Sequence, residues 1–190
     1  MVNKMSFSHV VQNFIFFQLG WLCCVIGGAN PGYAWVGVVA VAAIVAIHLL
    51  RAIDSRNEII LLGLSMAIGT AWDSSLMAAG IMQFNHGQLY GTFVPFWLIA
   101  MWPLFATTLN VSMKWMKGKY LLASVFGAIG GPLAYLAGNR LGAVEFSSTL
   151  NAMFVIGIGW SVIMPLLVNL AERFNGYRES RDTDYGLETA

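Results

Sequence analysis

The sequence predicts an all-α polytopic membrane protein, folded as a bundle of six transmembrane helices. Of its 190 residues, 58% are hydrophobic and only 10% are charged, whereas a soluble domain carries about 25% charged residues. The charges gather in residues 51–58, 114–119 and 172–179, with long apolar runs between them. This composition excludes a soluble enzyme, a disulfide-stapled secreted domain and a disordered chain. The net charge of +1 provides no basic field, so nucleic acid is not expected as a partner.

Six stretches approach the length of about 20 mainly apolar residues that a transmembrane helix needs. Residues 29–32 form a tight turn after the first stretch, and residues 85–87 open a polar loop before the fourth. We therefore expect one transmembrane domain over residues 1–172 and a short charged tail over residues 173–190. The expected spans are Val10–Gly28, Tyr33–Leu50, Ile59–Met82, Phe93–Met113, Tyr120–Gly138 and Ser148–Leu170.

The basic residues indicate how these spans are oriented. With a cytoplasmic N-terminus, only Arg140 among the ten Lys and Arg residues falls on the outer side. Because cytoplasmic loops carry an excess of Lys and Arg, this distribution predicts that both termini are cytoplasmic. The basic residues assigned to the cytoplasmic side are Lys4, Arg51, Arg56, Lys114, Lys117, Lys119, Arg173, Arg178 and Arg181.

Asp73 is the only acid well inside an expected span. A charge at such a depth costs about 2.5–3.5 kcal/mol, so this side chain should face the bundle interior or water. Its own helical face carries small and flexible residues, including Gly69 and Thr70. This pattern fits either a ligand- or proton-linked role or an aspartate that ties helices together. We expect Asp73 to lie in an enclosed polar cavity shared with a tryptophan and a side chain of the fourth or sixth span.

Four tryptophans, Trp21, Trp72, Trp102 and Trp160, fall near the middle of their expected spans. Tryptophan usually concentrates at membrane interfaces, so these four are placed to line an aromatic cavity around Asp73 for an apolar molecule, an acyl chain or a cation. Ordinary bundle packing is the alternative. The candidate ligand-binding residues are Asp73, Trp72, Trp102, Trp160, Trp21, Thr70, Thr107, Asn110 and Arg140.

Small residues recur at four-residue spacing in the fifth span, at Ala123, Gly127 and Gly131. Such stripes allow close helix packing, either within the bundle or against a second copy or a partner membrane protein. Arg140 follows this span, where it is suited to a lipid phosphate, an anionic substrate, a pair with Glu145, or the membrane interface.

The basic and aromatic residues around Lys114 and Trp115 are typical of an anchor to anionic lipid headgroups. No His, Cys and acidic residues share metal-ligand spacing, and the sequence holds no Walker loop, nucleophile elbow or zinc-protease motif. We therefore expect no metal or cofactor and identify no catalytic residue.

Several blocks in the second half resemble a known family. These blocks are Pro95-Phe96-Trp97-Leu98, residues 102–109, residues 127–135 and residues 138–143. They are similar to DUF2878, a family of small bacterial inner-membrane proteins of unknown function, over almost the whole chain. The resemblance implies location in a bacterial inner membrane and a link to fatty-acid modification.

Three functions fit these residues. The first is an inner-membrane protein that binds a lipid or other apolar ligand in an aromatic and acidic cavity, as an accessory to fatty-acid modification. The second is a small proton-coupled transporter or channel with Asp73 as the titrating group, which would have to dimerise. The third and least favoured is an intramembrane lipid-modifying enzyme. Membrane lipids are expected partners in each case.

Overall fold

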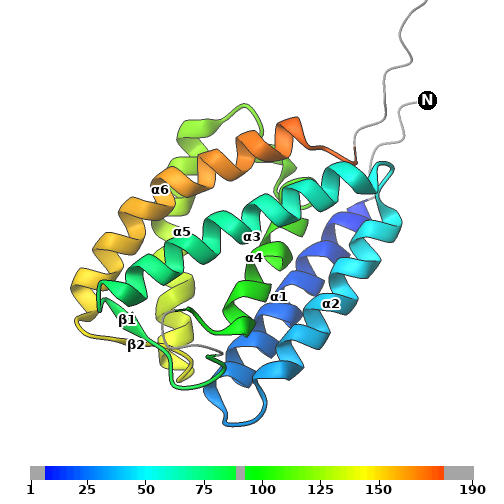
Figure 1. Cartoon of the computed structure of the whole chain (residues 1–190). Helices are drawn as coiled ribbons and strands as arrows, with labels where there is room; N and C mark the ends of the chain where they lie inside the picture. Colours follow the sequence, from blue (N-terminus) through cyan, green and yellow to red (C-terminus); the bar gives the residue numbers. More distant parts are fainter. Residues whose placement is uncertain (1–6, 89–92, 178–190) are drawn as a thin grey trace, which may run out of the picture.

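The computed structural model describes residues 7–88 and 93–177, and its architecture is all-helical (Figure 1). The described residues form six α-helices, and a strand in the α3–α4 connection pairs with a strand in the α5–α6 connection to make a small two-stranded clasp. The elements are α1 (Phe7–Ala29), α2 (Ala34–Arg51), α3 (Ser55–Ala78), β1 (Met82–Gln83), α4 (Phe96–Leu109), the 3₁₀ turn η1 (Lys114–Met116), α5 (Tyr120–Arg140), β2 (Glu145–Phe146) and α6 (Thr149–Arg173).

Five of these helices are long and apolar enough to cross a membrane, namely α1, α2, α3, α5 and α6. The fourth expected span is corrected by the structure, because α4 has only 14 residues. That length rises about 21 Å, less than the hydrocarbon core of about 30 Å. The helix ends at Leu109 because the carbonyl of Thr108 accepts from the backbone N–H groups of Val111 and Met113, which turns the chain toward η1.

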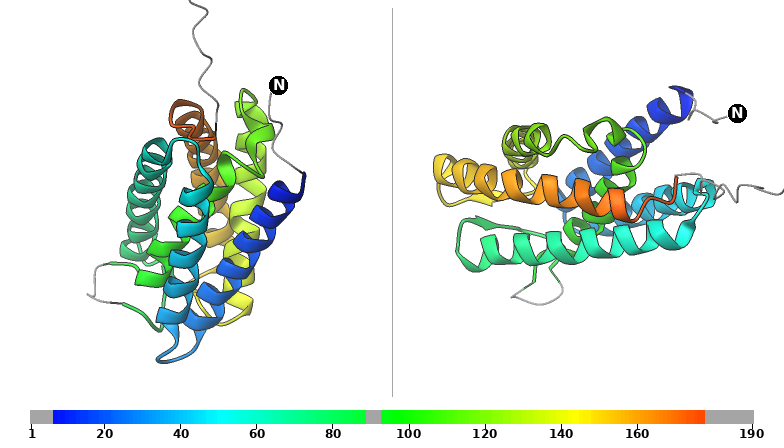
Figure 2. Two further views of the ribbon diagram at one scale, coloured as in Figure 1. Left: turned by 90° about the vertical axis from the view of Figure 1, so that its right-hand side faces the viewer. Right: turned by 90° about the horizontal axis from the view of Figure 1, so that it is seen from above.

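The short helix α4 lies in the middle of the bundle. It packs against α3 and against the α1–α2 hairpin, whereas α5 and α6 form a closely packed pair of their own. Figure 2 shows α4 enclosed by the longer helices. Its side chains Trp97, Trp102 and Leu104 are buried, while the outer faces of α5 and α6 expose Leu121 and Phe154. An apolar outer surface of this kind is suited to surrounding hydrocarbon.

The charged end of the bundle is more ordered than the sequence indicates. Helix α3 begins at Ser55, with Asp54 as its N-cap accepting from the backbone N–H groups of Arg56 and Asn57. The start of the expected charged tail also packs onto this end, because the backbone N–H groups of Ile53 and Asp54 donate to the carbonyl of Gly176 at 2.8 and 2.9 Å. Residues 174–177 therefore continue the bundle rather than leave it.

The opposite end is closed by the strand clasp. β1 and β2 pair antiparallel, with Met82 opposite Phe146 and Gln83 opposite Glu145. The side chain of Asn85 adds a hydrogen bond to Glu145 at 2.7 Å. The clasp ties the α3–α4 connection to the α5–α6 connection, a link that no sequence pattern indicated.

The small-residue stripe of α5 packs against α6 of the same chain, which confirms the expectation of close helix packing. A Cβ atom at Gly127 would lie 2.3 Å from the carbonyl oxygen of Trp160, and one at Gly131 would lie 2.3 Å from the indole ring of the same residue. A homodimer or partner protein would consequently need a different face from this stripe.

Replacing Gly131 with Leu should lower the melting temperature of the purified protein in detergent. The added side chain overlaps the Trp160 ring, and overpacking of this kind costs about 1–3 kcal/mol. Gly63→Leu is the matched control, since a Cβ there meets nothing within 4 Å. Equal melting temperatures for the two variants would contradict the α5–α6 packing.

Candidate functional site

Asp73 is a fully buried acid on the interior face of α3, which also carries Gly69. The indole N–H of Trp102 donates to Oδ2 of Asp73 at 2.7 Å. The hydroxyl of Tyr135 donates to the other oxygen, Oδ1. A buried carboxylate in an apolar setting needs such partners, and these two bonds join α3, α4 and α5.

The two tryptophans beside this acid stack on each other. The ring centroids of Trp102 and Trp160 lie 5.2 Å apart with an interplanar angle of 16°. Trp102 can approach α3 because Gly69 has no side chain, and a Cβ there would lie 1.7 Å from the ring. Phe105 meets Trp160 edge-on at 5.5 Å, so an aromatic cluster fills the centre of the bundle.

An apolar groove of about 280 Å³ opens beside this aromatic cluster, between α1 and α5. Helix α4 provides its floor and α6 contributes Trp160. Its mouth is flanked by the exposed rings of Phe14 on α1 and Phe126 on α5. The groove therefore opens sideways, onto the apolar outer surface of the bundle.

Its two long walls differ in character. The α1 wall carries the larger side chains, namely Phe14, Phe17, Gln18, Trp21 and Val25. The α5 wall is made mostly of small residues, which leave the space that the groove occupies: Gly127, Gly130, Gly131, Ala134 and Gly138, together with Phe126 and Tyr135.

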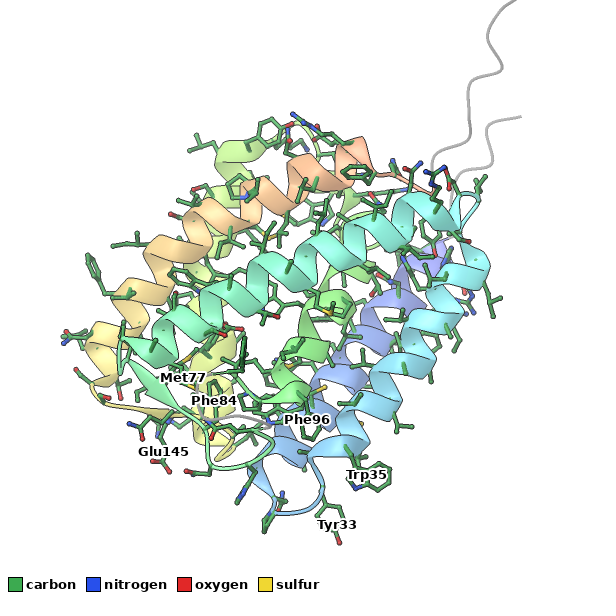
Figure 3. The ribbon with its side chains drawn as sticks, viewed as in Figure 1. Tyr33, Trp35, Met77, Phe84, Phe96 and Glu145 are labelled. Atoms are coloured by element: carbon green, nitrogen blue, oxygen red, sulfur yellow. The ribbon has the colours of Figure 1, made fainter. Side chains whose placement is uncertain are left out.

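The end of the groove next to the strand clasp is closed by buried side chains, including Phe84, Trp97 and Val144. Figure 3 shows Phe84 between β1 and the start of α4. Trp97 is only 2% exposed, and its indole N–H donates to the carbonyl of His86 at 3.1 Å. Trp35, by contrast, is exposed near the start of α2 (Figure 3).

Of the tryptophans and the acid that the sequence singled out, some line the groove and others do not. Trp21, Trp102 and Trp160 line the groove. Asp73 does not line it, because its carboxylate lies behind Trp102 and Tyr135. Trp72 also lies away from the groove, packed on Gly159 of α6.

The remaining candidates are dispersed. Thr70 follows Gly69 on α3 and has a buried hydroxyl without a hydrogen-bond partner among the described residues. Thr107 and Asn110 lie toward the charged end, where the Thr107 hydroxyl donates to the carbonyl of Leu104 at 2.7 Å. Arg140 is exposed at the end of α5, and in the part of the chain that the structure describes it forms no ion pair with Glu145.

Tyr135 is the main residue of the site that sequence reasoning missed. It follows Gly127 and Gly131 at four-residue spacing, so it shares their helical face. That spacing was a usable signal, since a phenol on the packing face of a transmembrane helix needs a buried partner for its hydroxyl.

A second polar cluster lies at the charged end around Glu58, which the sequence placed just outside the third span. Glu58 is fully buried. One oxygen accepts from the Asn110 side chain at 2.6 Å and from the Gly176 backbone at 2.8 Å, and the other lies 2.7 Å from Nε2 of His48. The cluster holds α2, α3, the end of α4 and the segment after α6 together.

Tyr177 completes this cluster from outside the membrane-spanning helices. Its hydroxyl donates to the carbonyl of His48 at 2.7 Å. Burial, and then the nearby carboxylate of Glu58, raise the pKa of Tyr177 above its usual value. The hydroxyl consequently stays protonated and keeps its role as a donor.

Within residues 7–88 and 93–177, no three His, Cys, Asp or Glu side chains are grouped to hold a metal ion. The described residues of the site offer an apolar shape, aromatic surface and hydrogen-bonding groups.

Comparison with known proteins gives one match. The model of a family described as "Protein of unknown function (DUF2878)" matches residues 10–166. No curated protein and no solved structure matches the chain.

Asp73→Leu should destabilise the protein far more than Asp73→Asn. Leucine leaves the N–H of Trp102 and the hydroxyl of Tyr135 buried without an acceptor, at about 1–3 kcal/mol for each group. Asparagine keeps an acceptor for Trp102 and offers an amide to Tyr135. Thermal unfolding in one detergent measures the difference.

The double variant Asp73→Leu/Tyr135→Phe is the control, because it removes one orphaned donor and should recover part of the lost stability. A melting temperature for Asp73→Leu equal to that of the unaltered protein would contradict this account.

Proposed function

The chain belongs to the DUF2878 family, and we propose that it is an integral membrane protein that binds a lipid or another apolar ligand in the groove between α1 and α5. The observation that carries this proposal is the shape of the groove. Ligand pockets are mainly apolar clefts of about 300–1,000 Å³, and this groove holds about 280 Å³ between aromatic and glycine walls.

The position of the groove supports a ligand that arrives from the bilayer. Its mouth lies between two helices whose outer faces expose Phe14 and Phe126. A water-soluble ligand would have to cross this apolar surface, whereas a lipid already lies beside it. The resemblance to inner-membrane proteins linked to fatty-acid modification points to the same class of ligand, and we extend the proposal to an accessory role in that chemistry.

The proposal includes six membrane crossings in the inner membrane, with both termini cytoplasmic. Although α4 is short, its start is bonded near Gly87 and the residue after it, Asn110, is bonded to Glu58 at the charged end. The chain thus passes between the two ends of the bundle at every helix. The charged end carries the basic residues of the α2–α3 and α4–α5 connections, and the positive-inside rule assigns such an end to the cytoplasm.

Proton-coupled transport is the alternative, and Asp73 is the observation that favours it. A transport role would require the carboxylate to reach water or substrate. Both of its oxygens are instead bonded to protein donors, and it does not line the groove. The geometry favours ligand binding with Asp73 as a positioning group. Proton flux in liposomes that is lost in Asp73→Asn would overturn this preference.

Gly130→Leu should remove a bound lipid without unfolding the bundle. Gly130 lines the groove, and a Cβ there meets only Phe126, at 3.7 Å, so leucine fills the groove without a clash. Native mass spectrometry should find lipid on the unaltered protein and little or none on this variant.

Gly63→Leu serves again as the matched control, because it adds the same side chain on a different, open helix face. Equal lipid retention by Gly130→Leu and Gly63→Leu would contradict the proposed function.

The topology has its own test. A reporter fused after Ala190 and another inserted between Lys114 and Tyr120 should both report a cytoplasmic location. If the insertion between Lys114 and Tyr120 is periplasmic, α4 does not cross the membrane and the six-span arrangement is wrong.

A further inference from the structure

The groove has the dimensions of one extended lipid chain. Along α5 its lining runs from Phe126 to Gly138, and along α1 from Phe14 to Val25. Twelve and eleven helical steps correspond to about 18 and 16 Å. One leaflet of the hydrocarbon core is about 15 Å thick, so the groove matches the length that an acyl chain occupies in one leaflet.

The two ends of the groove are not equivalent. At the strand clasp, the side chains of Phe84, Ala143 and Val144 are almost completely buried and close the groove. At the other end the lining includes Met113 and the exposed ring of Phe126. An amphiphile in this groove must place its apolar terminus at the clasp, because a headgroup there would be enclosed by apolar side chains.

The open end leads to basic and aromatic groups. Lys114 follows Met113 directly and is exposed. The next residue, Trp115, meets Phe126 edge-on at 6.0 Å, which places the η1 turn beside the mouth of the groove. Exposed Lys and Trp side chains of this kind favour the anionic headgroup region of a membrane.

Within residues 7–88 and 93–177, no acidic side chain forms an ion pair with Lys114. The two oxygens of Glu172 accept from the backbone N–H of Gly118 and the hydroxyl of Tyr120, in the connection that follows η1. Lys114 is exposed and directly follows Met113, which lines the groove, so its charge lies near the open end of the groove.

We propose, building on the proposed function, that the ligand of the groove is a single acyl chain of an anionic amphiphile, with its methyl end at the strand clasp and its negatively charged head beside Lys114. The shared chemistry is a fatty acyl chain that carries an anionic head. Its source is either an anionic phospholipid of the leaflet at the charged end or a free fatty acid.

The test uses the full-length protein in detergent with phosphatidylglycerol, phosphatidylcholine and a long-chain fatty acid offered in equal amounts. Native mass spectrometry should show more phosphatidylglycerol or fatty acid than phosphatidylcholine on the unaltered protein. Lys114→Gln should reduce this preference about fivefold, equivalent to the approximately 1 kcal/mol that one basic residue contributes near an anionic surface. Retention of phosphatidylglycerol without fatty acid identifies the phospholipid source, and the reverse identifies the free acid.

Lys119→Gln is the matched control, since it removes an exposed charge of the same connection that is not adjacent to the groove lining. An equal loss of preference in both variants, or no loss in Lys114→Gln, overturns the headgroup assignment. The proposed function survives that result as long as Gly130→Leu still expels the chain. Retention of lipid by Gly130→Leu overturns both.

The orientation has a separate readout. Fatty acids with a photoreactive diazirine at the methyl end should label the segments that contain Phe84 and Val144, whereas a diazirine next to the carboxyl group should label residues 113–116. The opposite labelling pattern would show that the head lies at the clasp and would overturn the proposed orientation.

Discussion

The contact on which the bundle depends is a tryptophan ring packed directly on a glycine of a neighbouring helix. Among the described helices it occurs four times, and a Cβ on the glycine would lie between 1.7 and 2.4 Å from a ring atom each time. No side chain larger than hydrogen fits at that distance, so each pair fixes how closely and at what height two helices approach. The pairs are Gly69 with Trp102, Gly131 with Trp160, Gly159 with Trp72 and Gly28 with Trp97.

Two buried acids then fix how α3 is rotated about its own axis among the helices that these contacts hold together. Glu58 and Asp73 lie on one face of the helix, about four turns apart. An unpaired carboxylate in a bilayer is costly, so α3 is held where both acids meet donors from α2, α4 and α5. Among the described residues no hydrogen bond joins α1 to α5. The groove lies at this one side of the bundle, where neither a polar tie nor a glycine–tryptophan pair draws the helices together.

The lengths of the apolar stretches predicted most of the fold, because they are a local property of the chain. Five expected spans are confirmed as helices long and apolar enough to cross a membrane. The end of α4 was missed because the turn at Thr108 carries no strong sequence signal, and because Asn110, which follows the helix, bonds to Glu58 and to the carbonyl of Phe174, both far away in the sequence. The same limit applies to the site. Trp102 was foreseen as a neighbour of Asp73, but Tyr135 requires knowing which helices are adjacent. The groove depends on the order in which the helices surround α4. Hydropathy predicts the helices but not which of them are neighbours, so the groove could not be predicted from it.

A groove in hydrocarbon gains little from the hydrophobic effect, because the lipid chains that it competes with are as apolar as its walls. Selection must therefore come from shape and from charge at the ends. The glycine–tryptophan contacts contribute to the first, since they fix α1 against α4 and α5 against α6 on either side of the groove. Walls that are held in place lower the entropy lost on binding. The basic turn at η1 supplies the second. Under the proposed function, rigid apolar walls and one charged mouth would together let the protein distinguish between lipids that share the same chains.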